Sequence, residues 1–207
     1  MRSIRSTALR LHAVLLLALT LCACDTPSLT PLNPGATILA FGDSLTYGTG
    51  APQDDAYPQV LARLTGLRVI NAGVPGEVSA EGAERLANLL VEHAPALVVL
   101  VHGGNDTLRN LPKTATRANL RSMIEASRRA GAEVVMLGVP GRNFSLSTPA
   151  YYGEIAAETD VPIDEDALPA LMRDRSMKSD AVHFNASGYA AMADAVASLL
   201  RDAGALR

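Results

Sequence analysis

The sequence predicts an α/β domain built on a parallel β-sheet that has helices on both faces. Two observations carry this prediction. Short runs of almost continuously apolar residues alternate along the chain with longer stretches in which apolar residues recur at helical spacing. Strands that are apolar throughout are typical of parallel sheets buried on both sides, and the alternating helices supply the crossover connections that such sheets need.

Three strands and two helices are expected in the first half of the domain. Apolar runs predict strands at Ile38–Phe41, around Val69–Ile70 and at Leu97–His102. Amphipathic spacing between them predicts helices at Tyr57–Leu64 and at Ser79–His93, and a proline two residues later ends the second helix.

The second half continues the same alternation. We expect a helix at Thr114–Ala130 closed by a glycine, a strand at Val134–Val139, a helix at Tyr151–Thr159 and a short edge strand at Val161–Ile163.

The last helix has the clearest pattern, because apolar residues recur at i, i+3, i+4 and i+7 from Tyr189 to Leu200. Either Asn185 or Ser187 is expected to cap it. The longest irregular stretch, Gly138–Pro149, is expected to border a functional site.

Residues 1–23 have the character of an export signal and are excluded from the domain. Three arginines precede an apolar run of 11 residues, Leu11–Leu21, which is too short to span a membrane. The following Leu21-Cys22-Ala23-Cys24 resembles a bacterial lipoprotein signal, with cleavage before Cys24 and lipidation of its thiol; an ordinary secretory signal cleaved nearby is the alternative. We therefore expect a protein of the cell envelope, anchored to a membrane through Cys24 and facing the periplasm, with a proline-containing tether at 24–35 and the domain at 36–207.

The composition of the chain without this leader excludes several classes of partner. Of the 207 residues, 184 remain, with 15 basic and 21 acidic side chains and a formal charge of −6. This charge argues against nucleic acid as a partner, and against electrostatic binding to anionic lipid. Both cysteines lie at positions 22 and 24, so neither a disulfide nor a cysteine-ligated metal is expected inside the domain. We expect a monomer.

Four short blocks carry the candidate chemistry. They are Gly42-Asp43-Ser44-Leu45, Gly73-Val74-Pro75-Gly76, Gly103-Gly104-Asn105-Asp106 and Asp180-Ala181-Val182-His183. The first three blocks follow the first three predicted strands, and the carboxyl ends of parallel strands share one edge of the sheet. Ser44, Gly76 and Asn105 are therefore expected to lie close together.

Ser44 and His183 are the candidate nucleophile and base. A serine hydroxyl becomes nucleophilic when a base takes its proton, and Asp180, three residues before His183, can fix the tautomer of the ring. The alternatives are a plain strand-end turn at Ser44 and a structural Asp/His pair before the last helix. The second glycine of the G-x-S-x-G elbow is missing, which argues against an ordinary α/β-hydrolase. His102 is a rival base, although we expect it to shape its turn.

A candidate oxyanion hole comprises the backbone N–H groups of Ser44 and Gly76 and the side-chain amide of Asn105. An Asx-turn at Asn105 and a positive φ at Gly76 are the structural alternatives. Asp43, Asp106 and Asn71 are expected to brace their loops. Since the chain has none of the zinc-protease, P-loop or dinucleotide-binding motifs, we expect no metal and no cofactor.

From Ile38 to Arg201 these blocks resemble the SGNH, or GDSL, hydrolase family, and most of all its bacterial thioesterase/arylesterase/lysophospholipase-like subgroup. The resemblance implies a flavodoxin-like three-layer α/β/α sandwich with a five-stranded parallel sheet. It places Ser44, Gly76, Asn105 and His183 with Asp180 in the family's catalytic blocks, and Gly73 is the alternative to Gly76 for the glycine role.

The implied activity is serine-dependent hydrolysis of carboxylic esters or thioesters through an acyl-enzyme on Ser44, with a small acyl ester or a lipid as substrate. The alternatives are an envelope polysaccharide O-deacetylase and a catalytically silent binding lipoprotein. The loops Thr46–Tyr57, Leu108–Thr114 and Gly141–Tyr152 are expected to set the shape of the pocket.

Overall fold

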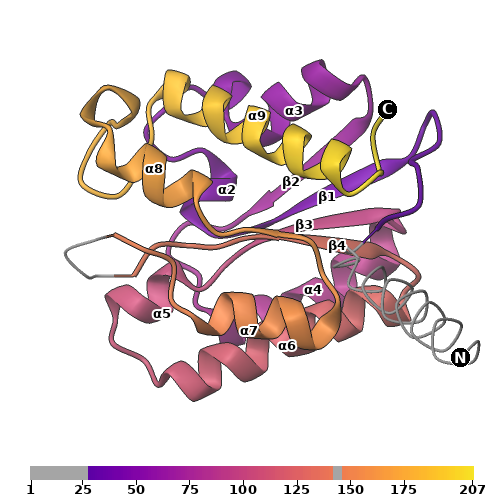
Figure 1. Ribbon diagram of the computed structural model, residues 1–207, viewed down its shortest axis with the longest axis horizontal. Coiled ribbons are helices and arrows are strands. Elements are labelled where there is room, and N and C mark those ends of the chain that lie inside the picture. Colours follow the sequence, from indigo (N-terminus) through magenta and orange to yellow (C-terminus); the bar gives the residue numbers. More distant parts are fainter. Residues whose placement is uncertain (1–27, 142–145) are drawn as a thin grey trace, which may run out of the picture.

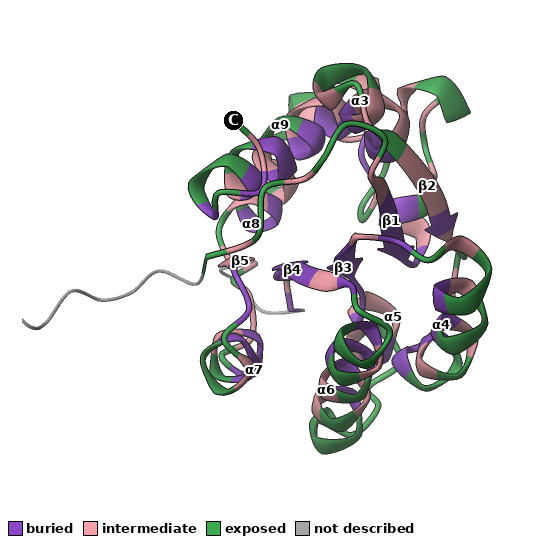
Figure 2. Ribbon diagram, turned by 90° about the vertical axis from the view of Figure 1, so that its right-hand side faces the viewer, coloured by how far each residue is buried: buried purple, intermediate pink, exposed green. Residues whose placement is uncertain are grey.

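The computed structural model describes residues 28–141 and 146–207 of the 207-residue chain. Its centre is a five-stranded sheet in which all neighbouring strands are parallel, in the spatial order β2-β1-β3-β4-β5 (Figures 1 and 2). The strands are β1 (Thr37–Gly42), β2 (Arg68–Gly73), β3 (Leu97–Val101), β4 (Glu133–Leu137) and β5 (Ile163–Asp164). The predicted parallel α/β sheet is confirmed.

Two layers of helices cover the sheet, one on each face (Figure 1). One layer contains α2 (Ser44–Tyr47), α3 (Tyr57–Thr65), α8 (Ala167–Arg173) and α9 (Ala186–Asp202). The other contains α4 (Ser79–His93), α5 (Gly104–Leu108), α6 (Lys113–Arg129) and α7 (Tyr151–Thr159). Two short 3₁₀ turns, η2 (Gln53–Asp55) and η3 (Arg175–Met177), lie in connections. This is the three-layer α/β/α sandwich that the family resemblance implied.

The long elements lie where the sequence pattern predicts them, and α4 and α7 have the predicted bounds. The alternative caps of α9 are resolved in favour of Asn185, whose side chain accepts a hydrogen bond from the Gly188 backbone N–H at 3.0 Å. The short helices α2, α5 and α8 are absent from the expectations, since helices of four to seven residues are too short to display a periodic pattern.

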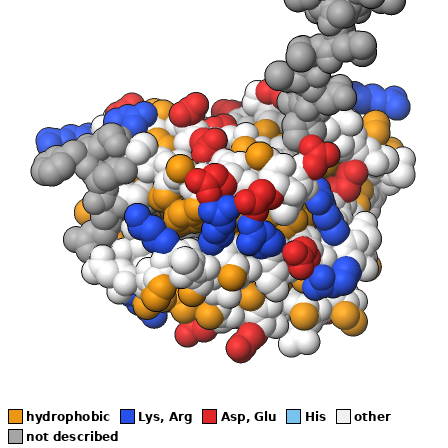
Figure 3. All heavy atoms as spheres, turned by 60° about the horizontal axis from the view of Figure 1, so that its bottom comes forward, with side chains coloured by type: hydrophobic (Ala, Val, Ile, Leu, Met, Phe, Trp, Pro, Cys, Tyr) orange, Lys and Arg blue, Asp and Glu red, His pale blue; other side chains and the backbone are white. Residues whose placement is uncertain are grey.

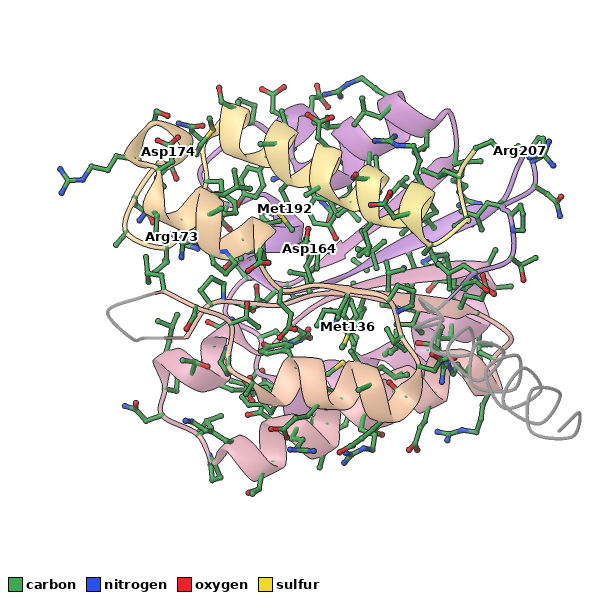
Figure 4. All side chains as sticks on the ribbon, viewed as in Figure 1. Met136, Asp164, Arg173, Asp174, Met192 and Arg207 are labelled. Carbon is green, nitrogen blue, oxygen red and sulfur yellow. The ribbon has the colours of Figure 1, made fainter. Side chains whose placement is uncertain are left out.

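The core lies on both faces of the central strands. Every residue of β3 is at most 2% exposed, and Figure 2 shows buried residues along the strands and on the inward sides of the helices. Met192 of α9 and Met136 of β4 lie on opposite sides of the sheet (Figure 4). Burial of a large aliphatic side chain contributes roughly 1.5–3 kcal/mol, so the two apolar layers are the main stabilising feature of the domain.

The outer face of α6 and α7 is polar. Figure 3 shows basic and acidic side chains interleaved on this side of the molecule. Arg117 pairs with Glu154 and Glu158, and Arg121 also pairs with Glu158, so that the pairs join the two helices. Exposed ion pairs of this kind contribute about 0–1 kcal/mol each.

The strand register brings the candidate blocks together. Gly42, the last residue of β1, is paired with Gly73 of β2 on one side and with Val101 of β3 on the other. The connections that leave these three strands therefore start side by side, at the point where the strand order reverses. Open parallel sheets bind their ligands at this position.

The chain before β1 is described from residue 28 onward. Leu29 and Leu32 donate backbone hydrogen bonds to Ala203 and Ala205, so this part of the expected tether 24–35 lies along the carboxyl end of the domain. The expected export signal and Cys24 lie outside the described residues. Among the residues that the structure describes, no helix combines the length and the apolar character needed to cross a bilayer.

Candidate active site

Ser44 is presented by a tight turn at the end of β1. Asp43 caps the short helix α2, because its carboxylate accepts a hydrogen bond from the Leu45 backbone N–H at 3.2 Å. The following residue, Ser44, is half-buried, and its hydroxyl Oγ lies 3.1 Å from Nε2 of His183. This separation is within hydrogen-bond reach for a nucleophile and its base.

His183 is held by the loop that precedes α9. Phe184, fully buried, packs edge-on against Tyr189 and pairs with Lys178 across an isolated β-bridge. The Ser179 backbone N–H donates to the carbonyl of His183 at 3.1 Å. These contacts fix the backbone on both sides of the imidazole, which faces Ser44 from the other end of the chain.

Asp180 orients the ring of His183. One carboxylate oxygen, Oδ2, lies 2.7 Å from Nδ1 of His183, and the other accepts the backbone N–H groups of Val182 and His183 at 2.8 Å each. Burial raises the pKa of Asp180, but the hydrogen bonds from the His183 ring and from these two N–H groups outweigh it and bring the pKa to about 2. An ionised Asp180 places the imidazole proton on Nδ1, which leaves Nε2 as an acceptor facing the Ser44 hydroxyl.

The turn after β2 brings Gly76 to the same place. Gly76 has a φ of +80°, a conformation that favours glycine. In the described ranges 28–141 and 146–207, neither the Ser44 nor the Gly76 backbone N–H donates to a protein acceptor. Both residues line the same pocket, so each can offer its N–H to a ligand there.

Asn105 lies in α5, directly after β3. Its side-chain nitrogen Nδ2 donates to the Glu77 carbonyl at 3.0 Å and to Oδ2 of Asp43 at 3.2 Å. Both amide protons therefore have protein acceptors. A bound oxyanion would share or replace the longer of these bonds, the one to Asp43. Burial raises the pKa of Asp43.

Asp106, in the third block, and Asn71, two residues before the second block, brace their loops, as expected. Asn71 accepts the Gly73 backbone N–H and donates to the Tyr47 carbonyl, tying β2 to α2. Asp106 is buried and accepts hydrogen bonds from the hydroxyls of Ser79 and Thr116, which joins α5 to α4 and α6.

His102 is not placed as the rival base. Its ring is fully buried, Nε2 lies 3.1 Å from Oε2 of Glu77, and Nδ1 accepts the Gly103 backbone N–H at 2.9 Å. Both nitrogens are thus engaged behind the pocket, and the bond to Gly103 fits the expectation that His102 shapes its turn.

A pocket of about 330 Å³ opens beside Ser44, and its wall is largely apolar. The irregular stretch Gly138–Pro149 borders it, as the sequence predicts. Residues 142–145 of that stretch lie outside the described residues. The apolar lining residues are Leu45, Pro75, Leu108, Val139, Pro140, Leu146, Met172, Ala181 and Val182.

Met172 is the pocket residue that sequence reasoning missed most plainly. It comes from α8, a short helix with an internal proline and no periodic signal.

Within the described part of the chain, no group of His, Cys, Asp and Glu is arranged to hold a metal ion.

Comparisons with known proteins point in one direction. The sequence matches the GDSL-like lipase/acylhydrolase family over residues 40–191. It is 34% identical over 140 residues to esterase TesA of Pseudomonas aeruginosa, covering 63% of this chain and 70% of the relative. It is 31% identical over 177 residues to thioesterase 1/protease 1/lysophospholipase L1 of Escherichia coli K12, covering 80% and 83%. The crystal structure of TesA matches with a TM-score of 0.74 at 30% identity, covering 81% of this chain and 99% of that structure.

Proposed function

The chain belongs to the GDSL-like lipase/acylhydrolase family and is a serine-dependent hydrolase of carboxylic esters or thioesters, and from this premise we propose that Ser44, His183 and Asp180 are its catalytic residues. One observation carries the assignment. The hydroxyl of Ser44, the ring of His183 and the carboxylate of Asp180 form a continuous line of hydrogen-bond contacts of 3.1 and 2.7 Å beside the apolar pocket.

The reaction follows from this line in two steps. His183 Nε2 takes the proton of Ser44 as Oγ attacks the carbonyl carbon, and Asp180 stabilises the imidazolium that forms. When the tetrahedral intermediate collapses, the bond to the leaving oxygen or sulfur breaks, and His183 returns the proton to it. Water, activated by the same imidazole, then attacks the acyl-enzyme and releases the carboxylic acid with Ser44 restored.

The Ser44 and Gly76 backbone N–H groups and the Asn105 amide form the oxyanion hole of this proposal. The two backbone groups support it most directly, since in the described part of the chain they have no protein acceptor. Losing one such donor costs about 10²–10³ in kcat, because the negative charge develops only in the transition state.

The apolar pocket is the proposed acyl site. Its volume of about 330 Å³ is at the lower end of the range for small-molecule sites, which favours short or medium acyl chains over long ones. Leu146 and Met172 lie on its wall, from loops and helices that differ from those carrying the catalytic residues. The family relatives named above are esterases and thioesterases, and no observation favours a polysaccharide deacetylase or a silent binding protein.

Hydrolysis of a series of p-nitrophenyl esters from acetate to palmitate tests this function. We expect a maximum at short or medium chain length, and loss of activity in Ser44→Ala with unchanged thermal unfolding. Ser198→Ala, an exposed serine of α9 outside the pocket, is the matched control and should keep full activity. Full activity in Ser44→Ala would refute the assignment.

We also propose that Cys24 carries a lipid that anchors the protein to a membrane of the cell envelope, with the domain facing the periplasm as a monomer. The leader composition supports this. Growth with a radiolabelled fatty acid should label the wild-type chain and not Cys24→Ser, and equal labelling of both would refute the anchor.

A further inference from the structure

His102 is a buried polar side chain that the proposed reaction does not use. It lies between the end of β3 and the start of α5, and none of it is exposed to solvent. A buried imidazole needs partners for both ring nitrogens, and these partners show what it holds in place.

The hydrogen bonds define the protonation of the ring. Nδ1 lies 2.9 Å from the Gly103 backbone nitrogen, which can only donate, so Nδ1 must accept and carries no proton. The proton of a neutral ring is then on Nε2, which donates to Oε2 of Glu77 at 3.1 Å. This tautomer satisfies both nitrogens.

Glu77 stands between two of the proposed oxyanion donors. It directly follows Gly76, and its own carbonyl accepts the Asn105 amide at 3.0 Å. Its carboxylate is clamped by Arg85, with contacts of 2.7 Å to both oxygens, and by His102. Burial raises the pKa of Glu77, but the bonds from Arg85 and His102 outweigh it and lower the pKa overall.

His102 is also tied to the turn that carries Asn105. Its Nδ1 holds the Gly103 N–H, and its carbonyl accepts the hydroxyl of the buried Tyr152 at 2.7 Å. The imidazole therefore joins two loops that contact each other through Asn105, one after β2 and one after β3.

A glycine in the first turn of α4, Gly82, gives the imidazole its space. A Cβ at Gly82 would lie 2.4 Å from Nε2 of His102 and 3.3 Å from Oε2 of Glu77. Glycine inside a helix is unfavourable relative to alanine by roughly 0.8–1 kcal/mol. The close approach of His102 explains why a glycine is needed there.

We propose that His102, through Glu77 and Gly103, is a positioning residue that holds the Gly76 and Asn105 donors in register around the oxyanion. This inference rests on the proposed function, because it assumes that these donors bind the oxyanion. A displacement of about 1 Å in a catalytic group can cost about 10² in rate. Loosening two donors without removing either should therefore lower kcat about 10- to 100-fold and leave KM nearly unchanged, since the donors act in the transition state.

Steady-state kinetics of the full chain with p-nitrophenyl butyrate test the inference. His102→Leu removes both ties and keeps an apolar side chain of moderate size. His102→Gln keeps a donor near the position of Nε2, whereas His102→Asn keeps an acceptor near the position of Nδ1. His93→Leu is the matched control, because His93 ends α4 at its carboxyl end and does not line the pocket.

The decisive arm is a double-mutant cycle with Asn105→Ala. If His102 acts through the oxyanion donors, His102→Leu should cost much less in kcat when Asn105 is already absent than in the parent chain. A residue that only stabilises the fold would lower the melting temperature and leave kcat of the folded protein unchanged. Circular dichroism and thermal unfolding of every variant separate the two cases.

A loss of kcat of about tenfold or more in His102→Leu, with KM within about twofold and non-additivity in the cycle, supports the inference. A parental kcat in folded His102→Leu, a loss confined to KM, or full additivity would overturn it. If His102→Leu does not fold, the Gln and Asn variants decide, and parental kcat in both refutes the role. Full kcat in Asn105→Ala would instead overturn the role of Asn105 in the proposed oxyanion hole, and this inference with it.

Discussion

Replacing Asp180 by asparagine should change which nitrogen of His183 carries the proton. The amide oxygen of the new side chain can keep the two backbone N–H bonds of Oδ1, which hold the loop, but its NH₂ group would then face Nδ1 in place of Oδ2. Since an NH₂ group can only donate, Nδ1 would become the acceptor and the proton would move to Nε2. Nε2 would then point a proton at the Ser44 hydroxyl and could not receive one.

The expected size of the effect follows from the exposure of Asp180. Where the acid of such a triad is buried, the change to asparagine costs about 10⁴ in kcat. The Asp180 side chain is 52% exposed, so water can take part of its role and its charge is partly screened. We therefore expect kcat to fall on the order of 10²–10³-fold.

The assay is steady-state hydrolysis of p-nitrophenyl butyrate, with thermal unfolding measured alongside. KM and the melting temperature should stay near the parental values, because the backbone hydrogen bonds of the loop are kept. Asp202→Asn, an exposed acid at the end of α9, is the matched control. A kcat of Asp180→Asn within about threefold of the parent would refute the tautomer argument.

Two further results are expected. Asn105→Ala should lower kcat about 10²–10³-fold with little change in KM, measured with the same ester, and a change in KM alone would contradict its role at the oxyanion. Gly82→Ala should destabilise the domain by about 1–2 kcal/mol in urea unfolding, because overpacking against His102 exceeds the gain in helix propensity. Unchanged or raised stability would contradict this, since it would mean that His102 and Glu77 can move away from the added methyl group.

The parts of the fold that repeat along the chain could be predicted from the sequence. The strand β3 and residues 38–41 of β1 are apolar throughout, and α4, α6 and α9 show helical periodicity over 15 residues or more. In a parallel sheet these patterns alone place Ser44, Gly76 and Asn105 at one edge. His183 is 139 residues away from Ser44 in the sequence. The contact between their side chains therefore depends on how the loop after η3 folds back.

Contacts that depend on tertiary packing could not be predicted. Glu77 resembles any surface acid in the sequence, and only the fold shows it held by Arg85 and His102 beneath the pocket. The apolar wall likewise takes Met172 from a short helix without a pattern of its own. Neither environment leaves a local signal in residue spacing, because each is assembled from segments far apart in the chain.

Covalent trapping at Ser44 tests the central claim most directly. The full chain would be treated with a p-nitrophenyl alkylphosphonate, and the adduct would be located by peptide mass spectrometry while residual esterase activity is followed. We predict one adduct per chain, on Ser44, with activity lost in proportion to labelling and no labelling of Ser44→Ala. Complete loss of activity with the adduct on another residue, or full labelling of Ser44 with activity retained, would contradict the account.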